Sequence, residues 1–197
     1  MINESGGQHE IRQPTSQVRQ EASIQEIYRQ LAEDDSRSEL IVADTVEAVQ
    51  NGRTPLILTN RRDHLERLAA MLAPSIPNVC VLHGGVRSRE RHRVIERLSR
   101  TSDPTVIVAT GRYLGEGFDH PRLDTLMLAL PVAWKGTLTQ YAGRLHRPAE
   151  GKTSACVYDY VDTGIPVLAR MYKKRERAYT ALGYALDGGR SRSGARA

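Results

Sequence analysis

Three side chains in the second half of the chain are spaced for phosphate chemistry. Gln140 lies four residues before Arg144, and Arg147 follows three residues later, so on a helix they share one face. A carboxamide and two guanidinium groups on one face form a donor cluster suited to the oxygens of a polyphosphate. A solvated arginine face gives the same pattern, and for two arginines without further context it is the ordinary interpretation.

A glycine-rich segment precedes this motif. Residues 109–121 read Ala-Thr-Gly-Arg-Tyr-Leu-Gly-Glu-Gly-Phe-Asp-His-Pro. Its glycines let the backbone approach a ligand closely, and Asp119 offers an acceptor for a hydroxyl group. Taken alone, such a segment is usually a turn.

The elements that must position these residues follow from hydrophobic patterning. Short apolar runs alternate with amphipathic stretches from Pro55 onward, which predicts βαβ units and a parallel sheet covered by helices on both faces. We expect strands at 56–58, 79–82, 106–109, 125–130 and 155–161, and helices at 63–72, 88–98, 138–145 and 167–182. The fold class is therefore α/β, open and doubly wound. Ligands of such sheets bind beyond the carboxyl ends of the strands, so the residues there are the candidates for function.

The chain divides into four expected segments. Residues 1–21 carry no periodicity and are predicted to be a flexible lead-in, and residues 22–53 to be a helical pair. Residues 54–185 form the α/β domain. Residues 186–197 are rich in Arg, Gly and Ser, and we expect a disordered tail there.

Composition excludes several classes of protein. With 197 residues, 40% of them hydrophobic, the chain can bury a core, and it contains no apolar run long enough to span a membrane. Its two cysteines, Cys80 and Cys156, are too few for a disulfide scaffold or a zinc site, and both fall in expected strands, where buried inert thiols are ordinary. We expect a reducing, cytoplasmic location.

The charge is basic and carried mainly by arginine. Lys+Arg is 28 against 23 for Asp+Glu, giving a net charge of +5, and only four of the 28 are lysines. Arginine forks match phosphate groups bidentately, which suits a phosphate-rich partner. GC-rich coding gives the same excess of arginine, so composition raises nucleic acid as a partner without deciding it. Five cations also crowd the last expected helix, where we favour contact with nucleic acid or another lobe: Arg170, Lys173, Lys174, Arg175 and Arg177.

Together these segments resemble the C-terminal RecA-like lobe of superfamily-two helicases. Gly115–Asp119 is similar to motif V of that family, Gln140–Arg147 to motif VI, and Thr54–Asn60 to motif IV. The resemblance covers roughly Pro55 to Leu182. The wording of residues 109–119 is most similar to bacterial helicases related to restriction-enzyme motor subunits and excision-repair helicases.

The resemblance implies a role for each matched residue. Gly117, Asp119 and Gln140 would bind ATP. Arg144 and Arg147 would reach the γ-phosphate as the catalytic residues, one of them as an arginine finger. Thr59, Thr110 and Arg112 would contact nucleic acid, with DNA favoured over RNA. ATP with Mg²⁺ would be held mainly by a complementary P-loop lobe, and no metal site is expected on this chain.

The family's nucleotide-binding motifs do not occur in these 197 residues. Gly151-Lys152-Thr153 lacks the glycine that a P-loop needs five positions earlier, where His146 stands, and it leads into a strand instead of a helix. We therefore expect the C-terminal half of an ATP-dependent DNA helicase or translocase. The alternative is a non-catalytic module derived from a helicase lobe that binds nucleic acid or a partner protein.

This interpretation predicts that the chain alone is not an ATPase. Without a P-loop lysine to hold the phosphates, the purified chain should hydrolyse ATP no faster than a buffer blank in a phosphate-release assay. Turnover that survives extensive purification and is lost in Arg144→Ala would contradict the prediction.

Overall fold

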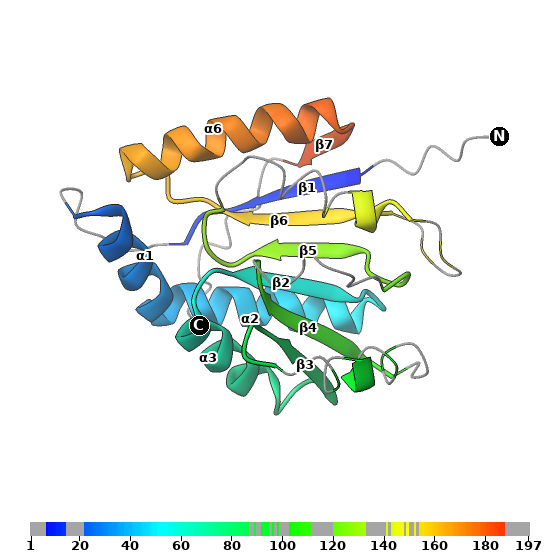
Figure 1. Cartoon of the computed structure of the whole chain (residues 1–197). Coiled ribbons are helices and arrows are strands. Elements are labelled where there is room, and N and C mark those ends of the chain that lie inside the picture. The colour runs from blue at the N-terminus through cyan, green and yellow to red at the C-terminus, as the bar shows by residue number, and fades with distance from the viewer. Residues whose placement is uncertain are drawn as a thin grey trace, which may run out of the picture.

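A computed structural model gives the architecture of the chain (Figure 1). It describes residues 7–14, 22–86, 89, 92–94, 96, 98, 103–111, 120–132, 141, 143–147, 149, 152 and 154–187. Its strands are β1 (Gly7–Arg12), β2 (Pro55–Thr59), β3 (Asn78–Leu82), β4 (Thr105–Thr110), β5 (Thr125–Leu128), β6 (Cys156–Tyr160) and β7 (Tyr184–Asp187). Its long helices are α1 (Ile24–Glu33), α2 (Asp35–Gln50), α3 (Arg62–Leu72) and α6 (Pro166–Ala181).

The strands form one seven-stranded sheet in the order β3-β4-β2-β5-β6-β1-β7. Every pairing is parallel, so all strands end at the same edge. The predicted α/β class and its parallel sheet are confirmed. Both cysteines lie in strands as buried free thiols. No described helix combines the length and apolar character that crossing a bilayer requires.

Helices cover both faces of the sheet, because alternate strand residues point to opposite sides. On one face Ile57, Val108 and Met127 pack against the buried sides of α2 and α3. On the other face Leu58 belongs to a core that includes Tyr179 of α6 and the side chains of Leu98, Tyr141 and Leu145. A third, smaller core joins α1 to α6 near the carboxyl end of β5.

The N-terminal segment was expected to be a flexible lead-in, and for Gly7–Arg12 this is wrong. These residues form β1, an inner strand between β6 and β7. The strand has no apolar run, and partners that are distant in the sequence stabilise it: Arg12 donates to Asp44 at 3.1 Å, and the His9 ring packs against Tyr179 with 3.8 Å between ring centroids. A Cβ on Gly7 would lie 2.6 Å from the Tyr184 ring, so this pairing requires glycine.

The C-terminal boundary also differs from the expectation. The tail was predicted to begin at 186, but the chain turns after α6 at Gly183, whose φ is +80°, and pairs with β1 as β7. A positive φ is favourable only for glycine, and this residue therefore permits the reversal. Residues 188–197 lie outside the described part of the chain.

Arg37, near the start of α2, is the most connected buried charge. Its guanidinium is 0% exposed and donates to both carboxylate oxygens of Asp162, at 2.8 and 3.0 Å. It also donates to the carbonyls of Ala129 and Tyr160, each at 2.9 Å. One side chain thus joins α2 to the segments that leave β5 and β6.

A second buried ion pair attaches α6 to the sheet. Arg175 donates to both carboxylate oxygens of Asp159, at 2.7 and 2.9 Å, and Tyr179 donates to the same carboxylate at 3.0 Å. His9 packs against this group from β1, and neither of its ring nitrogens has a hydrogen-bond partner. Burial lowers the pKa of His9 to about 4, so the ring is neutral near pH 7.

We predict that Arg37→Met strongly destabilises the fold, because it leaves the buried Asp162 carboxylate without its cation. The expected loss is about 3–5 kcal/mol of unfolding free energy in urea titrations. Arg29→Met removes an arginine whose ion pairs to Glu26 and Glu33 are exposed, and it should leave the unfolding free energy nearly unchanged. The double variant Arg37→Met/Asp162→Leu should recover part of the loss. A double variant as unstable as the sum of its single changes would contradict this account.

We predict that His9 makes the fold acid-sensitive. Its pKa in the folded chain, about 4, lies below its ordinary value of 6.5, so the unfolded chain binds the proton first and stability falls as the pH drops below 6.5. Between pH 7.5 and pH 5 this residue should account for a loss of about 2 kcal/mol. Urea titrations of His9→Phe should show a correspondingly smaller loss than those of the wild type over this pH range. An unchanged pH dependence in His9→Phe would contradict the prediction.

Candidate functional site

The carboxyl edge of the sheet brings the ends of β2 and β4 together. Thr59 and Thr110 are register partners on these adjacent strands, and the backbone N–H of Gly111 donates to the carbonyl of Thr59 at 3.1 Å. The N–H of Ala129, just after β5, donates to the carbonyl of Leu58 at 2.9 Å. The segments predicted to carry function after β2, β4 and β5 therefore start from one hydrogen-bonded edge.

Thr59 itself is turned inward. Its side chain is 1% exposed, and its hydroxyl lies 3.2 Å from Nδ1 of His64 and accepts the backbone N–H of Arg61 at 3.3 Å. Burial lowers the pKa of His64 to about 3, which keeps its ring neutral as a hydrogen-bond partner for the hydroxyl. The threonine therefore fixes the turn from β2 into α3. Its contact with nucleic acid stays a prediction.

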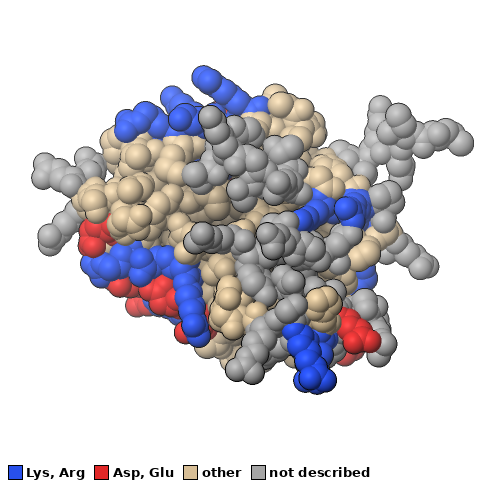
Figure 2. Space-filling view, in the orientation of Figure 1, with Lys and Arg blue, Asp and Glu red and all other residues tan. Residues whose placement is uncertain are grey.

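The start of α3 presents arginines at this edge. Arg61 pairs with Asp63 at 2.7 Å and lowers the pKa of that carboxyl group, and Arg62 pairs with Glu66 at 2.7 Å. Figure 2 shows basic and acidic side chains side by side over this corner of the molecule. The cations at the start of α3 are thus already compensated by acidic neighbours.

The turn after β3 is ordered by its histidine. The N–H of Gly85 donates to Nδ1 of His83 at 3.0 Å, and the N–H of Val86 donates to the carbonyl of His83 at 3.0 Å. A Cβ on Gly85 would meet the His83 ring at 2.9 Å, so glycine permits this close turn. His83 thus holds the turn that follows β3.

The helix predicted over residues 138–145, which we call the basic helix, packs against the face of the sheet that also carries α6. Gly143, Arg144 and Leu145 are helical, as is Tyr141, and the side chains of Tyr141 and Leu145 are buried in the core of that face. The hydroxyl of Tyr141 donates to the carbonyl of Gly111 at 2.7 Å, which ties this helix to the segment leaving β4. Arg144 is half-buried, with its guanidinium carbon 6.0 Å from the centre of the Tyr141 ring.

The backbone of Arg147 lies at another edge of the sheet than we expected. The residue follows the last helical residue, and its N–H donates to the carbonyl of Arg144 at 3.3 Å. The amine of Lys152 donates to the Arg147 carbonyl at 3.0 Å and to that of Pro121 at 3.4 Å. Because Pro121 precedes β5, the Arg147 backbone lies toward the amino edge of the sheet, not the carboxyl edge that we expected. The helix ends at Leu145, as predicted, and Arg147 follows it in a turn.

The other predicted site residues are outside the described part of the chain. Gly117, Asp119, Gln140 and Arg112 belong to segments whose placement is not described. Their roles stay predictions. Among the residues that are described, no three histidine, cysteine, aspartate or glutamate side chains gather in a metal-binding arrangement.

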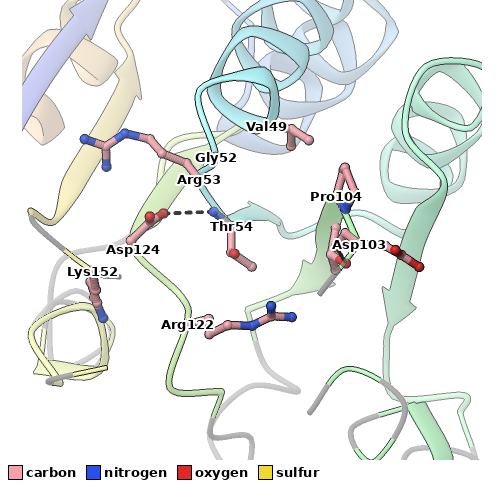
Figure 3. A pocket seen from close by; sticks show the side chains of 10 residues that line it. Val49, Gly52, Arg53, Thr54, Asp103, Pro104, Arg122, Asp124 and Lys152 are labelled. Atoms are coloured by element: carbon pink, nitrogen blue, oxygen red, sulfur yellow. Dashed lines mark hydrogen bonds between the residues drawn. The ribbon is translucent and has the colours of Figure 1, made fainter. Parts of the chain in front are cut away.

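A hollow at the amino edge of the sheet escaped the sequence analysis (Figure 3). Its volume is about 280 Å³. Arg53, Arg122 and Lys152 line it together with Asp103 and Asp124. Asp124 accepts the N–H of Thr54 at 3.0 Å, and burial raises the pKa of this carboxyl group and lowers that of Lys152. The mixed charges come from the four segments that precede β2, β4, β5 and β6, and no motif in the sequence links them.

The sequence of the chain matches a protein family model and curated relatives. The profile described as "Helicase conserved C-terminal domain" matches residues 36–149, from the first turn of α2 to the segment after Arg147. The transcript termination protein A18 of fowlpox virus (strain NVSL) is 28% identical over 159 residues, which are 79% of this chain and 34% of that protein. The chain thus spans about a third of the length of this relative.

Solved structures agree on the fold. The crystal structure of T4 UvsW superposes with a TM-score of 0.76 at 18% identity, covering 93% of this chain and 41% of that one. Domain 2 of the DEAD-box helicase Mss116p, solved bound to an RNA duplex, gives a TM-score of 0.62 at 13% identity and covers 94% of this chain and 65% of that one. The matched profile includes β2 to β5 and the basic helix. The chain therefore belongs to the helicase conserved C-terminal domain family.

Proposed function

We propose that this chain is the C-terminal lobe of an ATP-dependent motor that moves along nucleic acid. The observation that carries the proposal is the hydrogen bond from Tyr141 to the carbonyl of Gly111. It joins the helix similar to motif VI to the start of the segment similar to motif V. In a motor, those two segments must respond together to one nucleotide.

ATP and Mg²⁺ would be held mainly by a P-loop lobe, and this chain would add positive charge. Arg144 suits that task because its half-buried guanidinium stands over the Tyr141 ring, which restricts its freedom. A preorganised guanidinium stabilises the charge that develops on a transferring phosphoryl group. Arg147, whose backbone lies toward the amino edge, is the weaker candidate for the finger. Gly117, Asp119 and Gln140 would complete the nucleotide contacts.

Nucleic acid is the proposed track, with DNA favoured over RNA. The basic balance of the chain supports a phosphate-rich partner, and domain 2 of Mss116p was solved with an RNA duplex. Thr110 and Arg112 would contact the backbone beyond β4, where the half-buried Thr110 ends its strand. Closure of the two lobes on ATP, and reopening after hydrolysis, would then advance the strand.

Two observations favour the alternative of a non-catalytic binding module. The side chain of Thr59 is buried, and the Arg147 backbone lies toward the amino edge of the sheet instead of the carboxyl edge. A module that binds nucleic acid without assisting hydrolysis would tolerate both features. The next experiment separates the two functions.

We predict that Arg144→Ala removes ATP hydrolysis from a reconstituted two-lobe protein. When a P-loop lobe from a superfamily-two helicase is fused to this chain, the variant should lose on the order of a thousandfold in turnover, because an arginine finger is worth that much. Binding of a fluorescent ATP analogue and the melting temperature should change little. Arg147→Ala, tested beside it, identifies which arginine acts on the phosphate.

The control is Arg29→Ala, an exposed arginine on α1 that is paired only with its own helix. It should hydrolyse ATP at the wild-type rate. If Arg144→Ala also keeps full turnover, the motor proposal is wrong and the binding module is the better account. If the variant unfolds, Arg144 is a structural residue.

A further inference from the structure

The outer face of α6 carries a row of cations. Arg170, Lys173, Lys174 and Arg177 are all exposed and are spaced three, four and seven residues from the first, so they form one stripe along the helix. We refer to these four residues as the cationic stripe. Its length is about 10 Å, from the rise of an α-helix. Figure 2 shows basic side chains along this helix with no acidic side chain among them on the visible face.

The structure separates the stripe from the fifth cation of the helix. Arg175 points inward, is 1% exposed and forms a buried ion pair with Asp159. The buried side of α6 is formed by Leu168, Tyr172, Arg175, Ala178 and Tyr179. The helix is therefore held by one face, and the stripe contributes nothing to that attachment.

Nothing within the described part of the chain neutralises the stripe. None of its four side chains makes a hydrogen bond or an ion pair with a described residue. In contrast, Arg61 and Arg62 near the start of α3 are each paired with an acidic side chain. The one acidic residue of α6, Glu176, is half-buried. Like charges at i and i+4, as in Arg170–Lys174 and Lys173–Arg177, repel each other and destabilise a helix. A row of four uncompensated cations is therefore a cost to this fold that an anionic partner would remove.

The chemistry of the face selects the kind of partner. A stable protein interface needs an apolar or aromatic centre, and an interfacial membrane helix needs an apolar face. The apolar face of α6 is already buried, and Ile24, on α1, is the one exposed large hydrophobic residue in the described ranges. Successive phosphates of one strand of duplex DNA are 3.4 Å apart along the helix axis, so a row of about 10 Å laid along that axis spans about three of them.

We infer that the cationic stripe is a second nucleic-acid contact, which binds the phosphate backbone without reading sequence. The stripe lies outside residues 36–149, the part of the chain matched by the family profile, so it is separate from the contacts of the family motifs. The inference rests on the proposed function for its partner. It assigns to α6 the task of holding a flanking stretch of the same nucleic acid.

The test is direct binding without ATP. Fluorescence anisotropy of a labelled oligonucleotide of about 20 nucleotides, single-stranded and duplex, is followed from about 50 to 200 mM salt. Neutralising all four stripe residues to Gln should weaken binding about tenfold or more and flatten the salt dependence by about three released ions. Affinity should fall equally for oligonucleotides of unrelated sequence.

A matched pair of variants separates a local site from overall charge. Lys173→Gln/Lys174→Gln and Arg29→Gln/Arg67→Gln each lower the net charge from +5 to +3. The second pair removes arginines that already have acidic partners, Glu26 and Glu33 for Arg29 and Asp35 for Arg67. The stripe pair should flatten the salt dependence by about two ions and the control pair by less than one.

Each possible outcome of these binding experiments either supports or overturns the inference about the cationic stripe. Equal losses in the matched pair would overturn the inference, because charge alone would then explain them. So would unchanged oligonucleotide binding in the four-residue variant, including a case in which that variant instead loses retention on anionic vesicles or polyglutamate. The binding test contains no ATP, so unchanged oligonucleotide binding in the four-residue variant would not contradict the motor proposal. If Arg144→Ala loses ATP hydrolysis while the stripe variants bind oligonucleotide normally, the motor proposal is supported and only the inference about the stripe is wrong.

Discussion

The Arg37–Asp162 ion pair is the interaction on which the carboxyl edge depends. Arg37 lies at the start of α2, yet its guanidinium bonds the segments that follow β5 and β6. Burial of this charge is tolerated because each guanidinium nitrogen has a partner and the carboxylate balances the charge, so separating the pair would leave an unpaired buried ion. This makes α2 part of the sheet's architecture and not an appendage to it.

A continuous set of contacts runs from that ion pair to the predicted catalytic arginine. Arg37 bonds the carbonyl of Ala129, whose N–H bonds the carbonyl of Leu58. The next residue, Thr59, accepts from Gly111, and the carbonyl of Gly111 accepts from Tyr141, whose ring underlies Arg144. One series of contacts thus connects the buried guanidinium of Arg37 with the guanidinium of Arg144 across three strands.

A structural element could be predicted from the sequence when the residues that stabilise it are close to it in the sequence, and not when they are distant. The strands β2 to β6 and the helices around them are local apolar patterns, and the sequence analysis found them. The strand β1 is polar, and its partners Asp44 and Tyr179 lie far along the chain, so no local signal identifies it. The buried position of Arg175 could have been found, since Leu168, Tyr172, Arg175 and Tyr179 follow the helical period. The buried position of Arg37 could not be predicted, because a single arginine in the polar first turn of a helix is not part of any hydrophobic periodicity.

The cations that the structure describes include two chemical groups that composition cannot distinguish. One group is paired within the fold, whether buried as Arg37 and Arg175 or exposed as Arg29 and Arg62. The other is presented to solvent, and the cationic stripe is its clearest member. Within the described part of the chain, the basic charge that first suggested nucleic acid thus includes one surface of α6 whose cations have no acidic partner.

The central claim is that this lobe closes on a nucleotide held by another lobe, and the affinity between the two tests it most directly. Titration calorimetry of the chain against a separately purified P-loop lobe, with and without a non-hydrolysable ATP analogue, measures it. Closure on the nucleotide predicts association at least about tenfold tighter with the analogue, a coupling of about 1.4 kcal/mol. Equal affinity in the two conditions, or no association at all, would contradict the claim.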